Sequence, residues 1–258
     1  MGITREVRGG VTWLTIDRPA VRNALSLDTA RELTALLAGV DGDADVRAVV
    51  VTGAGDRVFA SGADLTEMQT QMDTPDAARR YDAVFEAMYA ALESCRVPTI
   101  ARIQGHAIGG GCFLALACDL RIAASRVLLG VPAVRVGVGL SPSEVRRLVQ
   151  SVGPWRAKWL LFTGARLAAV DAQAWGLVDQ VVGDGELDEA IDRLVADIAR
   201  GAPLAIRTAK RMVTAVSAGL PIDESILREA YDTVYGSADL REGISAFLEK
   251  RPPLFRGT

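Results

Sequence analysis

The chain has 258 residues, half of them hydrophobic and about a quarter charged, and its formal net charge is −3. This composition is ordinary for a globular protein with ample material for an apolar core. A slightly acidic chain without a basic block is a poor candidate for binding nucleic acid or an anionic membrane surface. No apolar signal core and no uncharged run of about 18 apolar residues occurs, so we expect a cytoplasmic protein without a membrane span.

The cysteines and the single histidine do not form a metal-ligand pattern. Cys95, Cys112 and Cys118 contain no CxxC pair, and His106 is the only histidine. This usage is typical of a reducing compartment, and we expect no metal site. We further expect Cys112 to be an inert packed thiol and His106 to be structural.

Hydrophobic periodicity predicts strands that alternate with helices along the first part of the chain. Strands are expected at 11–17, 46–52, 99–104, 120–124, 127–131 and 177–182, and helices after Ser26 to about Val40, at 75–94 and at 112–118. The alternation indicates an α/β fold with some parallel pairing. Beyond about Pro154 helical patterns dominate, at 186–200, 203–217, 221–235 and 238–248. We therefore expect an α/β core at 1–185 and a helical region at 186–258, whose apolar residues would pack against another subunit.

Three consecutive glycines, Gly109, Gly110 and Gly111, join an expected strand to an expected helix. Such a run lets the backbone approach another group closely or adopt positive φ, and it leaves free amides at a helix N-terminus. An anion or a reaction oxyanion suits that position, and glycines used only for tight packing remain the alternative. A phosphate loop would need Gly-Lys-Ser/Thr, and a dinucleotide fingerprint would need Gly-x-Gly-x-x-Gly; neither spacing is present.

Five segments in order resemble the enoyl-CoA hydratase/isomerase (crotonase) superfamily over nearly the whole chain. They are DRPAVRNALS (17–26), VFASGADL (58–65), QGHAIGGG with ALACDLRIA (104–123), TGARLAAVDAQAWGLVDQVV (163–182) and AFLEKRPPLFRGT (246–258). The resemblance implies a crotonase-like spiral of ββα units with a helical C-terminal trimerisation region, assembled as a homotrimer or a dimer of trimers. It implies an acyl-CoA ligand, with coenzyme A as part of the substrate and no separate cofactor.

The resemblance also implies a set of site residues. By motif match, the backbone N–H groups of Ala63 and Gly110 would form an oxyanion hole around the thioester carbonyl, worth roughly 3–4 kcal/mol per donor. The match places five residues along the CoA path and a C-terminal pair at the CoA end: Ala24, Ala60, Asp64, Leu65, Thr66 and, in the tail, Phe247 and Lys250. Asp64 could instead cap the following helix, and Lys250 could be a solvated terminal charge.

The chain departs from the hydratase pattern at two positions. The family's hydratases carry one glutamate three residues after the middle glycine, where this chain has Phe113, and another in a G-x-P-E pattern, where it has Ala133. Each acid/base group typically contributes about 10²–10⁴ in rate, so we expect hydratase activity to be severely impaired. Phe113 and Ala133 would instead line an apolar part of the substrate pocket.

Two residues further along the chain could replace the missing glutamates. Some isomerases of the family place a carboxylate where this chain has Ser141, and Glu144 follows three residues later. The same residues also read as a capping box, with Ser141 as N-cap and Glu144 reaching back to its N–H. Two functions remain open: an enzyme with isomerase, decarboxylase or other enolate chemistry, and an acyl-CoA-binding protein without turnover.

Overall fold

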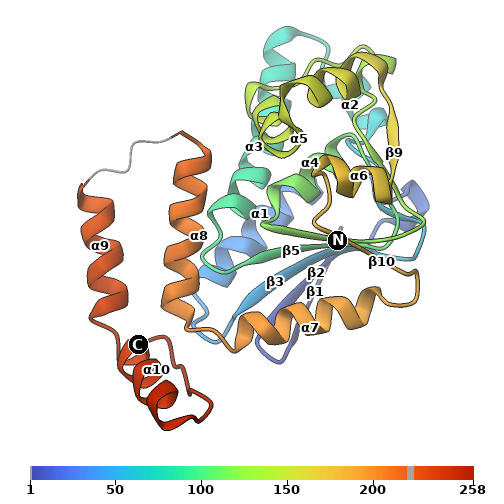
Figure 1. Cartoon of the computed structure of the whole chain (residues 1–258). Helices are drawn as coiled ribbons and strands as arrows, with labels where there is room; N and C mark the ends of the chain where they lie inside the picture. Colours follow the sequence, from blue (N-terminus) through green and yellow to red (C-terminus); the bar gives the residue numbers. More distant parts are fainter. Residues whose placement is uncertain (1, 220–223) are drawn as a thin grey trace.

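The computed structural model describes residues 2–219 and 224–258 and contains two β-sheets surrounded by helices (Figure 1). The larger sheet has the spatial order β1 (Ile3–Arg8), β2 (Val11–Ile16), β3 (Ala48–Gly53), β5 (Thr99–Ile103), β7 (Leu120–Ala124) and β10 (Gln180–Val182). β1 and β2 form an antiparallel hairpin, and the other neighbours pair in parallel. Every residue of β3 is buried, as expected for an apolar parallel strand that is covered on both faces.

The smaller sheet has the order β4 (Val58–Ala60), β6 (His106–Ile108), β8 (Leu128–Gly130) and β9 (Arg166–Ala168). β4 follows β3, β6 follows β5 and β8 follows β7, so successive units place one strand in each sheet. Helices follow these strand pairs, which confirms the expected α/β spiral of ββα units.

The helices of the spiral begin at residues with clear capping signals. Ser26 Oγ accepts a hydrogen bond from Thr29 N at the start of α1 (Leu27–Asp41), and Thr74 caps α3 (Pro75–Ser94). α4 (Gly110–Ala117) is buried along nearly its whole length and contacts α3 and α5 (Pro142–Thr163). The short elements η1 (Pro19–Val21), α2 (Leu65–Gln71), η2 (Ala133–Arg135) and α6 (Ala169–Trp175) complete this part of the chain.

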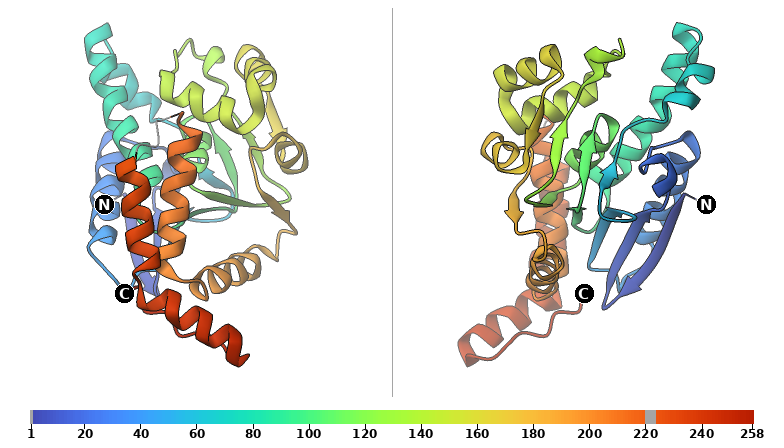
Figure 2. Two further views of the ribbon diagram at one scale, coloured as in Figure 1. Left: turned by 60° about the vertical axis from the view of Figure 1, so that its left-hand side comes forward. Right: turned by 90° about the vertical axis from the view of Figure 1, so that its right-hand side faces the viewer.

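The expected helical region contains helices with two different surroundings. α7 (Leu187–Ala199) packs on the larger sheet, with Leu187 and Ile191 in the core. α8 (Pro203–Ser217) lies beside the spiral, with Lys210 Nζ 2.7 Å from Asp119 Oδ2, and α9 (Glu224–Tyr235) and α10 (Ala238–Glu249) lie farther out (Figures 1 and 2). Residues 221–223 of the predicted 221–235 helix lie outside the described residues. The 185/186 boundary stays a prediction, and no described helix is long and apolar enough to cross a membrane.

Candidate active site

The two glycine-containing turns predicted to carry the site lie against each other. Gly62, which precedes Ala63, has φ +103°, and Gly109, which precedes Gly110, has φ +56°. A Cβ atom on Gly62 would lie 3.3 Å from Gly110 N, and one on Gly110 would lie 3.4 Å from Ala63 N. The absence of side chains therefore allows the two backbone amides to approach the same small space.

The backbone groups next to Ala63 N–H and Gly110 N–H form hydrogen bonds, whereas, among the described residues, these two amides do not. Leu25 pairs with the Gly62 turn in a parallel bridge, in which Leu25 N donates to Gly62 O and Asp64 N donates to Leu25 O. Gly109 N donates to Gly130 O, and Gly110 is then the first residue of α4. Within the described part of the chain, neither Ala63 N–H nor Gly110 N–H donates a hydrogen bond. Two free amides, one at a helix N-terminus, can stabilise negative charge on a ligand oxygen.

A cavity of about 610 Å³ adjoins the two amides. Its lining includes nine of the predicted site residues: Ala24, Ala63, Asp64, Leu65, Thr66, Gly110, Phe113, Ala133 and Glu144. Ala60 lies behind the amides: its oxygen would be only 2.1 Å from a Cβ on Gly111, so it fixes the packing of α4 against β4. The structure thus brings residues 24–66 and 110–144 together around one space.

Asp64 has the capping contacts that were considered as its alternative role. Its Oδ1 accepts hydrogen bonds from Thr66 N and Glu67 N at the start of α2, and its Oδ2 lies 3.3 Å from a guanidinium nitrogen of Arg18. Because Asp64 also lines the cavity, the cap and a position beside a ligand are compatible.

Ser141 and Glu144 form the predicted capping box. Glu144 N donates to Ser141 Oγ at 3.2 Å, and Ser141 N donates to Glu144 Oε2 at 2.9 Å. Glu144 nevertheless faces the cavity, where burial raises the pKa of its carboxyl to about 7, and the negative charges of Glu86 and Asp82 act in the same direction. The cap therefore positions a carboxyl group that exchanges its proton near neutral pH.

α3 contributes side chains that the sequence analysis missed. Glu86 lines the cavity and accepts a hydrogen bond from Ser141 Oγ at 2.6 Å, and the buried Tyr89 hydroxyl donates to Gly110 O at 3.2 Å. These residues share one helix face with Asp82 and Glu93, at spacings of three and four residues. A polar stripe of this kind on a helix with an apolar core face was the signal that could have found them.

Apolar residues stand where the hydratase glutamates were expected. Phe113 is fully buried and packs against Tyr89, with ring centroids 6.5 Å apart. Ala133 begins the short helix η2 at the cavity wall. Neither side chain can exchange a proton.

The other reactive side chains make structural contacts, and His106 also lines the cavity. His106 Nδ1 accepts a hydrogen bond from Leu128 N at 3.0 Å, which holds β6 against β8. Cys112 is fully buried, and burial raises the pKa of its thiol to about 12, as expected for an inert cysteine.

The two predicted C-terminal residues lie away from this cavity within one chain. Phe247 is 83% exposed on α10 and borders an apolar groove between α8 and α10. Lys250 follows α10 in the left-handed conformation, with φ +56°. Neither residue lines the cavity of its own chain, so their predicted contact with CoA stays a prediction.

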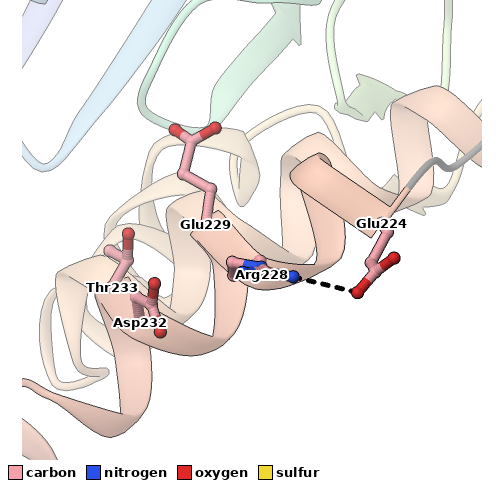
Figure 3. A pocket seen from close by; sticks show the side chains of 5 residues that line it. All are labelled: Glu224, Arg228, Glu229, Asp232 and Thr233. Atoms are coloured by element: carbon pink, nitrogen blue, oxygen red, sulfur yellow. Dashed lines mark hydrogen bonds and ion pairs between the residues drawn. The ribbon is translucent and has the colours of Figure 1, made fainter.

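A polar hollow on α9 does not have the character of a site. Figure 3 shows its five lining side chains, with Arg228 directed toward Glu224 at 2.9 Å and Glu229 pointing elsewhere. Glu229 pairs instead with Arg211 of α8 at 2.7 Å. Exposed ion pairs of this kind are typical of a solvated helix face.

The two-sheet spiral with free amides at the head of α4 defines a crotonase-like α/β protein. A family model described as enoyl-CoA hydratase/isomerase matches residues 6–258. The short-chain-enoyl-CoA hydratase of Clostridium acetobutylicum is 35% identical over 250 residues, which cover 95% of this chain and 94% of that protein. The crotonyl-CoA hydratase of Syntrophomonas wolfei is 36% identical over 246 residues, covering 94% and 93%.

Solved structures agree with these sequence relatives. An enoyl-CoA hydratase/carnithine racemase from Magnetospirillum magneticum superposes with a TM-score of 0.96 at 32% identity, covering 100% of this chain and 96% of that one. An enoyl-CoA hydratase from Bacillus anthracis gives a TM-score of 0.91 at 33% identity, covering both chains completely. The chain belongs to the enoyl-CoA hydratase/isomerase family, whose members act on CoA thioesters.

Proposed function

We propose that this chain is an enzyme that converts an acyl-CoA thioester through an enolate, with isomerisation of a double bond in the acyl group as the favoured reaction. The observation that carries this proposal is the position of Glu144 in the cavity that Ala63 and Gly110 also line. A carboxyl group with a pKa of about 7 can both accept and donate a proton near neutral pH. The two amides would stabilise the charge that develops on the thioester oxygen.

Hydration of an enoyl-CoA is the reaction that the relatives' names suggest, and the cavity argues against it. Hydration needs groups that take a proton from water and give one to the substrate. Phe113 and Ala133 offer neither at the two positions where the family's hydratases carry glutamates, and the buried Phe113 ring fills space there with apolar surface; the carboxyl groups of this cavity lie instead on α3 and α5. Decarboxylation remains compatible with the same amides, because loss of CO₂ generates the enolate without a protein base.

The alternative is an acyl-CoA-binding protein that does not turn its ligand over. The apolar Phe113 and Ala133 favour it, since they suit an acyl chain without supplying chemistry. The two functions differ in whether the protein converts the bound acyl-CoA to a product or releases it unaltered.

The test incubates the purified protein with 2-enoyl-, 3-enoyl-, malonyl-type and β-ketoacyl-CoA and follows products by chromatography. We expect conversion of 3-enoyl-CoA to 2-enoyl-CoA, and loss of this activity in Glu144→Gln. Glutamine can still accept the hydrogen bond from Ser141 N, so this variant keeps its capping box and its fold. Fast hydration of 2-enoyl-CoA would overturn the proposal, and a thermal shift without any turnover would favour the binding protein.

We also propose that the chain assembles as a homotrimer or a dimer of trimers. Apolar side chains are exposed on α9 and α10, with Phe247 at 83%, Tyr231 at 60% and Tyr235 at 63%. Such a surface is costly to leave in water and suits contact with another subunit. Light scattering coupled to size-exclusion chromatography should give three or six times the chain mass, and a monomer would refute this proposal.

A further inference from the structure

A second carboxylate, Glu86, lies in the cavity beside Glu144 and is held by the same serine. Ser141 Oγ donates to Glu86 Oε1 at 2.6 Å, while Ser141 N donates to Glu144 Oε2 at 2.9 Å. Glu86 comes from α3, and Ser141 and Glu144 come from the start of α5. One residue thus fixes two carboxyl groups from different helices at the wall of one cavity.

The surroundings of the two carboxyl groups favour opposite protonation states. Burial opposes ionisation of Glu86, but hydrogen bonds from Ser141 and Ser143 and the charge of Arg147 outweigh it and lower its pKa. Burial raises the pKa of Glu144 to about 7. A pair of neighbouring carboxyl groups with separated pKa values is the arrangement by which enzymes obtain a base and an acid at one pH.

Glu86 is not needed to neutralise Arg147. The Arg147 side chain is only 3% exposed, and Glu93 already binds it, with Nε 2.6 Å from Oε1 and Nη2 3.2 Å from Oε2. The contact from Arg147 to Glu86 is longer, at 3.3 Å. Glu93 does not line the cavity, whereas Glu86 does. The pairing with Arg147 therefore accounts fully for Glu93, whereas Glu86 combines its contacts to Ser141 and Arg147 with a place at the cavity wall.

We propose that Glu86 is a second acid/base residue of this site, with Glu86 as the base and Glu144 as the acid. The inference rests on the proposed function. In the conversion of a 3-enoyl-CoA, the Glu86 carboxylate takes the proton from Cα, and the electron pair of that C–H bond forms a dienolate whose oxygen binds the Ala63 and Gly110 amides. The Glu144 carboxyl then gives its proton to Cγ, which leaves the 2-enoyl-CoA. Afterwards Glu86 loses its proton to solvent and Glu144 takes one up, so the protonation states are restored.

Other charged and titratable groups lie around the pair. They are Asp82, Tyr89 and Glu93 on α3, Arg146 and Arg147 on α5, and Arg135 on η2. Asp82 adds negative charge that favours the protonated form of Glu144. Arg147 offsets this charge on the side of Glu86.

The test separates the two proton transfers by NMR in D₂O with a 3-enoyl-CoA. Exchange of the Cα protons reports removal by the base, and deuterium at Cγ of the product reports delivery by the acid. The test variants are Glu86→Gln and Glu144→Gln. Glu93→Gln is the matched control, because Glu93, like Glu86, binds Arg147 but does not line the cavity. Melting temperatures of all three establish that they fold.

We expect Glu86→Gln to lose both Cα exchange and product formation by roughly 10²–10⁴-fold. Glu144→Gln should keep Cα exchange within about tenfold and lose Cγ delivery, and Glu93→Gln should stay within about threefold of wild type in both. The inference is overturned if Glu86→Gln isomerises like wild type while Glu144→Gln loses both steps, because Glu144 then acts alone. If wild type neither exchanges nor isomerises, the proposed function itself fails, and the assignment of Glu86 fails with it.

Discussion

Replacement of Gly110 by alanine tests whether the two backbone amides hold the thioester oxygen. A Cβ at this position would lie 3.4 Å from Ala63 N and 3.2 Å from the Tyr89 hydroxyl. These are tight to ordinary contacts, so α4 can accept the methyl group with a shift of a few tenths of an ångström at Tyr89. The methyl group would nevertheless occupy the space in front of Ala63 N–H, where a ligand oxygen must come within about 3 Å. Loss of one such donor costs about 3–4 kcal/mol, or roughly 10²–10³-fold in rate.

The stability of Gly110→Ala should change little, because alanine favours a helix over glycine by about 1 kcal/mol and offsets the tight contact. Gly39→Ala in α1 is a matched control, since its Cβ would meet nothing within 4 Å. The assays are Cα proton exchange of butyryl-CoA in D₂O and the infrared carbonyl stretch of the bound ¹³C-labelled thioester. We expect slower exchange and a smaller red shift in Gly110→Ala alone. An unchanged exchange rate together with an unchanged carbonyl stretch would refute the placement of the oxygen between the amides.

Further predictions concern stability and reactivity. Gly111→Ala should destabilise the fold by about 3 kcal/mol or more, because its Cβ would lie 2.1 Å from the backbone oxygen of Ala60; a melting temperature near that of wild type would contradict this packing. Ser141→Ala should lose about 1 kcal/mol of stability with its N-cap, measured by urea denaturation, and a gain in stability would contradict the capping role. Cys112 should resist a thiol reagent at neutral pH in the folded protein, since its pKa is about 12, and fast stoichiometric labelling would show that α4 opens. The folded pKa of Glu144 lies above its ordinary value of 4.5, so the stability it contributes is present below about pH 4.5 and is lost as the pH rises through about 7. Wild type should therefore lose up to about 3 kcal/mol relative to Glu144→Gln between pH 4 and 8, and parallel pH–stability curves would refute the raised pKa.

The sequence predicted best those helices that begin at a recognisable residue such as proline. The helices at 75–94 and 203–217 have the expected bounds, because proline stands at the first turn of each. Four strands were missed: Ile3–Arg8, Val58–Ala60, His106–Ile108 and Arg166–Ala168. The first is an edge strand with only Ile3 buried, and the others have three residues each, so none shows a clear apolar alternation.

In the site, the sequence likewise located the features that depend on neighbouring residues and missed the contact between residues far apart in the chain. The turns before Ala63 and Gly110 are local glycine features, so the motifs located them, although they could not show that the turns meet. Glu86 reaches Ser141 across 55 residues of sequence, and this contact depends on how α3 packs beside the start of α5. No periodicity within either helix specifies that packing, which is why the second carboxylate was visible only in the structure.

The arrangement of the cavity separates two tasks that the hydratase pattern joins. In the proposed reaction, charge stabilisation stays with backbone amides, which do not depend on the side chains at 113 and 133. Proton transfer would come from α3 and α5, which carry Glu86 and Glu144, and not from α4 and η2, which carry Phe113 and Ala133. The carbonyl stretch of a bound thioester should therefore respond to Gly110→Ala and not to Glu144→Gln, whereas proton delivery should respond to both. A shared loss of carbonyl polarisation in both variants would mean that the amides and the carboxyl group act as one unit, and that the chemistry cannot be divided in this way.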